Sequence, residues 1–207
     1  IIAKLEKGQI LEGTVKNMYV ASNTEEVELF VNGQSLGRNS TPVNNYQFTF
    51  ENVAWVSGTI KAVGYNGGVE VCSTEKKTAG APAKIRLTPT TGPNGFLANG
   101  SDVLMIDVEV VDAEGNRYPT DEARIDFTMD GPGIWRGGYN SGLEDSVNKD
   151  YLLTEAGINR VFVRSTLTPG TITVTARRDG SNLEPGTISV QSIPVEINGG
   201  LSLDEPN

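Results

Sequence analysis

Histidine is absent from this sequence of 207 residues, and cysteine occurs only once, at Cys72. Without histidine the chain can build neither a Ser-His-Asp nor a Cys-His catalytic arrangement, nor a histidine-ligated zinc site. One cysteine can form no intramolecular disulfide bond and cannot supply a thiolate zinc site. We therefore expect no metal ion and no cofactor, and we interpret Cys72, which ends the alternating run Val69–Cys72, as a strand residue.

Positive charge and long apolar runs are also scarce. Lysine and arginine together number 17 against 26 aspartates and glutamates, which gives a formal net charge of −9. An acidic surface repels phosphate backbones, so we expect no nucleic-acid partner. No run approaches about 18 apolar residues, the length that spans a bilayer, so we expect no membrane insertion. The sequence starts at Ile1 with no signal peptide in view, and we expect a piece or mature product of a longer chain.

Glycine and proline, by contrast, are plentiful, with 24 and 10 residues. They lie between short runs in which apolar and polar residues alternate, such as Val27–Val31, Thr59–Val63, Val103–Val111 and Thr171–Ala176. Frequent turns and two-residue periodicity are typical of all-β proteins. Each half of the chain holds about six to eight such strands, the number found in an immunoglobulin-like domain. The sequence therefore predicts an all-β fold of two tandem immunoglobulin-like β-sandwich domains.

The two predicted domains are separated at Lys76–Ala83, where two lysines precede small residues, a glycine and a proline that offer little to bury. We place the first sandwich at residues 1–78, the second at residues 79–200 and a short tail at residues 201–207. No segment is a convincing helix. The window Leu143–Ala156, which lacks glycine and proline, is interpreted as a loop with at most one or two helical turns.

The run Ser22–Arg38 holds the pair Asn32-Gly33 between two alternating stretches, the strongest short-range signal of a β-hairpin. This run also resembles a segment that recurs in bacterial family 2 glycoside hydrolases, above all β-galactosidases. There the segment belongs to the small sandwich domain that follows the catalytic barrel. The strand Gly58–Tyr65 and the junction Thr78–Ala83 resemble further pieces of the same domain.

The part of the chain after the boundary resembles the next immunoglobulin-like domain of those enzymes. Its recognisable pieces are Ala98–Asp102, Val108–Asn116, Gly131–Gly133 and Pro169–Ala176. The resemblance departs at Gly137–Gly142, where many relatives carry a Gly-x-x-Asn-Gly-Asp loop and this chain has no acidic residue. We therefore carry over no ligand role to that loop.

The resemblance implies a non-catalytic C-terminal accessory fragment of a β-galactosidase-like glycoside hydrolase. Its partner would be the missing catalytic barrel of the same polypeptide, and the full enzyme would hydrolyse β-galactosides or related glycosides with retention. The resemblance also implies a periplasmic, extracellular or cell-surface location. Two other hypotheses stay open: a carbohydrate-binding module, and a cell-surface immunoglobulin-like adhesin or spacer.

Glycoside hydrolysis needs two carboxyl groups in a cleft, one of them with a raised pKa. The acids in the predicted strands, such as Asp107 and Glu109, alternate outward onto solvent-facing surfaces. In the enzymes that the chain resembles, the catalytic acids lie in the barrel, and no position here matches them. We therefore predict no catalytic residue in this chain.

One acidic turn could offer ligands to a cation. Asp112, Glu114 and Asn116 alternate around Gly115 and present oxygen atoms of the kind that calcium binds. The spacing is far short of an EF-hand loop. A plain turn, in which glycine and asparagine adopt left-handed backbone geometry, is the favoured interpretation.

The remaining candidates are aromatic. Trp135, Arg136, Tyr139 and Asn140 form a compact set of aromatic, cationic and amide side chains in a glycine-rich stretch. Sugar rings stack on exposed aromatic faces because their C–H bonds present apolar patches to the ring. This set is the predicted carbohydrate-binding platform. For Trp135 itself, packing in the core is the favoured interpretation, whereas Tyr139 is more open.

Overall fold

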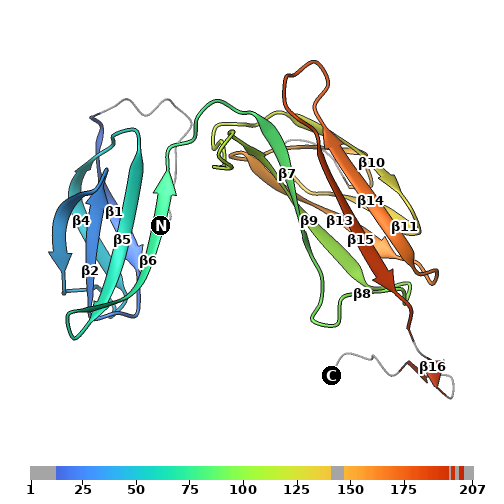
Figure 1. The fold of residues 1–207 in the computed structure, drawn as a ribbon, viewed down its shortest axis with the longest axis horizontal. Coiled ribbons are helices and arrows are strands. Elements are labelled where there is room, and N and C mark those ends of the chain that lie inside the picture. Colours follow the sequence, from blue (N-terminus) through green and yellow to red (C-terminus); the bar gives the residue numbers. More distant parts are fainter. Residues whose placement is uncertain (1–12, 141–146, 196, 199–200, 203–207) are drawn as a thin grey trace. The chain divides into compact units, whose positions relative to one another are not determined.

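Strands joined by turns, bends and irregular segments make up the described part of the chain, and no α-helix occurs in it. A computed structural model describes residues 13–140, 147–195, 197–198 and 201–202. The chain divides into a first unit, residues 1–78, and a second unit, residues 79–207, which run from blue to turquoise and from green to red in Figure 1. Within those ranges, no helix is long and apolar enough to cross a bilayer. The predicted all-β fold of sandwich domains is confirmed.

The first unit packs a two-stranded antiparallel sheet against a four-stranded one. The smaller sheet pairs β1 (Val15–Ala21) with β4 (Gln47–Ala54). The larger sheet has the order β3 (Gln34–Asn39), β2 (Glu26–Val31), β5 (Thr59–Asn66) and β6 (Val69–Lys77).

Period-two alternation decides which side chains fill the space between these sheets. Val27 and Leu29 of β2 are at most 1% exposed and pack with Phe48 of β4, which is fully buried. Burial of each such side chain stabilises the fold by about 1.5–3 kcal/mol. The edge strand β6 lies outside this core and is exposed along its whole length, Cys72 included.

The hairpin between β2 and β3 turns at Asn32 and Gly33, whose φ angles are 49° and 81°. Asparagine and glycine tolerate this left-handed geometry. The Asn32 carboxamide also reaches the turn before β5. It accepts the Thr59 N–H at 2.7 Å and donates to the Ser57 carbonyl at 3.1 Å. Gly58 lies between these two partners, where a Cβ would stand 1.9 Å from Asn32 Oδ1, so only glycine fits.

The second unit packs a five-stranded sheet against a four-stranded one, and within the described ranges the strands of these sheets pair antiparallel, except β15 with β8. The five-stranded sheet has the order β12 (Tyr151–Leu153), β10 (Arg124–Asp130), β14 (Gly170–Arg177), β15 (Gly186–Ile193) and β8 (Phe96–Leu97). The four-stranded sheet has the order β11 (Gly133–Gly138), β13 (Ile158–Ser165), β9 (Val103–Val111) and β7 (Lys84–Thr90).

The central strand β9 shows how the second core is built. Leu104, Ile106 and Val108 are at most 1% exposed, while Asp107 and Glu109 alternate to the outer face. There Asp107 accepts two hydrogen bonds from an arginine of β13, and Glu109 accepts two from an arginine of β7. Such outward pairs satisfy the charges without burying them.

Two segments differ from their sequence-based description. The window Leu143–Ala156 holds the strand β12, which pairs with β10, and its first residues lie outside the described ranges. The predicted tail begins in a short hairpin, because β17 (Leu201–Ser202) pairs with β16 (Ile197–Asn198). Residues 203–207 lie outside the described part of the chain.

The junction between the units is hydrogen-bonded on both sides. The Thr78 N–H donates to the Gly58 carbonyl at 2.8 Å, and the Thr78 hydroxyl accepts the Gly58 N–H at 3.1 Å. Two residues later, the Gly80 N–H donates to Asp112 Oδ2 at 2.8 Å. Thr78 is therefore tied to the first unit and Gly80 to the second.

Candidate functional site

Trp135 lies on β11 opposite Val163, and its ring packs against the core of the second unit. The centroid of the indole ring is 5.3 Å from that of Phe127. The indole Nε1 donates to the Lys149 carbonyl oxygen at 2.7 Å. Both the apolar ring and its polar edge are thus engaged within the fold, in line with the packing role favoured for Trp135.

A β-bulge at Arg136 decides where the rest of the predicted platform points. The pairing register of β11 shifts between Trp135 and Gly137, and Gly137 has a φ of 65°. One extra residue reverses the alternation beyond it, because side chains on a strand alternate with period two. Tyr139 is accordingly 67% exposed, whereas Asn140 is fully buried.

Asn140 must therefore be removed from the predicted platform. Its Nδ2 donates to the Leu153 carbonyl at 3.1 Å, and its buried Oδ1 finds no hydrogen-bond partner among the described residues. A side chain with no exposed surface cannot reach a sugar in solvent. Arg136 and Tyr139 do face solvent, and carbohydrate binding by these two residues stays a prediction.

The acidic turn after β9 is organised by Asp112. Its Oδ1 accepts the Asn116 N–H at 2.7 Å, and its Oδ2 accepts the Asn116 side-chain amide at 3.0 Å as well as the Gly80 N–H. These hydrogen bonds, the one from the Asn116 side chain foremost, lower the pKa of Asp112 to about 2. Both carboxylate oxygens serve the turn, and no group of three metal-ligating side chains gathers within the described ranges.

The structure contains a buried ion pair, Arg178 with Asp121, that the sequence did not predict. Arg178, which directly follows β14, donates from both terminal nitrogens to the Asp121 carboxylate, each at 2.7 Å. The Thr154 hydroxyl also donates to Asp121. Burial raises the pKa of Asp121, but the hydrogen bonds from Arg178 and Thr154 outweigh it and hold that pKa below its usual range. No local pattern marks the pair, since its members lie 57 positions apart.

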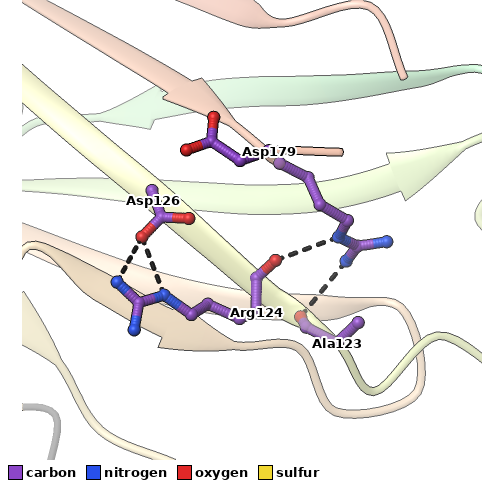
Figure 2. A pocket seen from close by; sticks show the side chains of 5 residues that line it. Ala123, Arg124, Asp126 and Asp179 are labelled. Carbon is purple, nitrogen blue, oxygen red and sulfur yellow. Dashed lines mark hydrogen bonds and ion pairs between the residues drawn. The ribbon is translucent and has the colours of Figure 1, made fainter. Parts of the chain in front are cut away.

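Figure 2 shows the open hollow beside this pair, with a volume of about 450 Å³ and a lining of Ala123, Arg124, Asp126, Arg178 and Asp179. Arg124 donates twice to Asp126 and lies 3.9 Å from the centre of the Tyr151 ring. The Arg178 guanidinium donates to the Arg124 and Ala123 carbonyls, as the dashed lines show. Each charged residue that lines the hollow therefore has a partner within the fold, and the bonds of Arg178 link the end of β14 to the start of β10.

Comparison with known proteins decides the family. A family profile described as "Glycoside hydrolase family 2 C-terminal domain 5" matches residues 85–189, which lie in the second unit. The chain belongs to glycoside hydrolase family 2. Its two units are C-terminal β-sandwich domains of that family, and no catalytic barrel is part of them. A second profile, "Domain of unknown function (DUF4982)", matches residues 13–72 in the first unit.

Individual relatives agree with this assignment. A β-glucuronidase of Formosa agariphila is 50% identical over 194 residues, covering 94% of this chain and 20% of the relative. The β-galactosidase BoGH2A of Bacteroides ovatus is 37% identical over 56% of the chain and 13% of the relative. A solved structure of a family 2 β-glucuronidase superposes with a TM-score of 0.80 over 92% of this chain and 20% of that one. The chain thus spans about a fifth or less of these relatives.

Substitution of Arg178 by alanine should strongly destabilise the second unit, because Asp121 would stay buried without its cation. Breaking a buried pair in this way costs about 3–5 kcal/mol of unfolding free energy. Arg177→Ala is the matched control, since the ion pair of Arg177 with Asp179 is exposed and its loss costs less than about 1 kcal/mol. Urea denaturation measures both variants, and equal losses would contradict the role given to Arg178.

Asp112 should make the stability of the second unit depend on acid pH. Its pKa is lower in the folded than in the unfolded chain, so its ionised form stabilises the fold above about pH 4. That contribution is lost as the pH falls toward about 2. Urea denaturation of the parent and of Asp112→Asn, which cannot ionise, should show a stability gap that closes over this window. A gap independent of pH would refute the assignment.

Proposed function

We propose that the chain is a non-catalytic accessory region of a family 2 glycoside hydrolase whose full-length form hydrolyses β-galactosides or related glycosides. Relatives named β-glucuronidase and β-galactosidase both match the chain. Their names support β-galactosides and β-glucuronides as the substrate classes of the full-length enzyme. Family membership favours this role over that of a free-standing adhesin or spacer, because the matched region is one small part of each relative.

The pKa values of the carboxyl groups are the main support for a non-catalytic role. A glycosidase needs a carboxylic acid whose pKa is raised, close to a second carboxylate. In the described part of the chain, every carboxyl group with a shifted pKa is shifted downward, namely Glu28, Asp112 and Asp121. For Glu28 the main cause is the hydrogen bond from the Ser35 hydroxyl. These acids are held ionised by structural partners, which suits anchoring and opposes proton donation.

The partner in this proposal is the catalytic barrel of the same polypeptide. The relatives are about five times as long as the matched region or longer, which leaves ample chain for a catalytic domain. The two units would pack against the barrel, shape the edge of its site or support oligomerisation. By family resemblance, we place the whole enzyme in the periplasm, outside the cell or at its surface.

The purified chain should not release nitrophenol from 4-nitrophenyl β-galactoside or 4-nitrophenyl β-glucuronide above the buffer rate. The full-length polypeptide, assayed in parallel at the same molar concentration, should hydrolyse at least one of these or a related aryl glycoside. Turnover that copurifies with the chain, and that disappears when one of its own carboxylates is replaced by an amide, would overturn the proposal.

A further inference from the structure

An open groove runs along one side of the first unit, where edge strands of its two sheets meet. β3 and β4 line it, and Asn39 bridges them by donating its side-chain amide to the Thr49 carbonyl at 2.9 Å. Its volume is about 530 Å³, and it is open to solvent. Nothing in the family match assigns a role to this groove, since the matching profile is a domain of unknown function.

Apolar side chains reach the groove from the core and from its rim. Phe50 and Val53 belong to the core of the first unit, at 8% and 7% exposed, and both also line the groove. Leu36 on β3 lines it as well and is 45% exposed. The C–H face of a pyranose ring loses water contact favourably when it packs on such a surface.

A β-bulge supplies the polar side of the groove. The register of β1 against β4 shifts between Lys16 and Met18, so Asn17 lies opposite two residues, Glu51 and Asn52. Asn52 has a φ of 56°, and its N–H donates to Asn17 Oδ1 at 3.3 Å. Bulges re-aim side chains, and here two consecutive residues are both exposed and both line the groove.

The fold does not use these polar side chains. Within the described ranges, the side chains of Ser40, Glu51 and Asn52 make no hydrogen bond or ion pair, although all three line the groove. Asp112 and Asp121, by contrast, are fully engaged. A hydroxyl, a carboxylate and an amide together provide the donors and acceptors that neighbouring sugar hydroxyls require.

We propose that this groove binds a neutral oligosaccharide, with a sugar ring on Leu36 and its hydroxyls bonded to Glu51, Asn52 and Ser40. The charges that line the groove favour a neutral sugar over an anionic one. Arg38 also lines the groove, but ion pairs with Glu26 and Glu28, at 3.3 Å and 3.2 Å, balance its charge. The carboxylate of Glu51 is left without a cation and repels uronates and sulfated sugars. This site is independent of whether the chain has catalytic activity.

Nuclear magnetic resonance titration of the 207-residue chain tests the proposal, because each backbone amide reports its own surroundings. The probes are galactotetraose and cellotetraose as neutral chains and tetragalacturonate as an anionic chain of equal length. At least one neutral probe should shift the amide signals of Leu36, Ser40, Glu51 and Asn52, and the anionic probe should not. If neither neutral probe shifts the amide signals of these residues, the proposal is overturned. It is also overturned if the anionic chain shifts them more than the neutral chains do.

Paired glycine substitutions separate binding from folding. Asn52→Gly removes the amide at a left-handed position that glycine adopts without strain, so the backbone is kept. Affinity should fall about fivefold, the loss of roughly one hydrogen bond. Asn44→Gly makes the same change at another left-handed position, φ 52°, outside the groove, and should leave affinity unchanged. Equal loss in both variants, or shifts confined to Arg136 and Tyr139, would contradict the site.

Discussion

The carboxamide of Asn32 ties together turns that lie far apart in the sequence. It holds the β2–β3 hairpin against the turn before β5, and Gly58 in that turn exchanges two hydrogen bonds with Thr78. Backbone groups at turns lie outside the sheet ladders and must find partners elsewhere, and one side chain supplies them here. The segments of the first unit that carry the family resemblance therefore meet at this cluster.

In the second unit, the side chain of Asp112 likewise supplies hydrogen-bond partners to backbone groups at turns. Its carboxylate closes the turn that follows β9 and also receives the Gly80 N–H from the junction. The recognisable segments of both units thus anchor the ends of the junction. Arg178 and Asp121 likewise use their charged groups for hydrogen bonds within the fold. The side chains of Glu51 and Asn52 make no such contact within the described residues, and we propose that they are available to a ligand.

Strand alternation could be predicted because it is local, and β2 and β9 bury the residues that their periodicity indicates. The burial of Asn140 could not be predicted. The one-residue bulge at Arg136 reverses which side chains beyond it point to the core, and no local sequence pattern marks this bulge. Arg177 and Arg178 look alike in the sequence, and only the fold brings the second one to Asp121. The groove likewise depends on two strands of different sheets, which no single segment encodes.

Amide hydrogen exchange across Thr78–Ala83 tests the anchoring of the junction most directly. The N–H groups of Thr78, Gly80 and Ala83 are hydrogen-bonded, whereas those of Ala79 and Ala81 have no partner within the described residues. An anchored junction predicts slow exchange at Thr78, Gly80 and Ala83 and fast exchange at the two alanines between them. Uniformly fast exchange from Thr78 to Ala83 would contradict it and would show that the family-typical segments do not hold the junction.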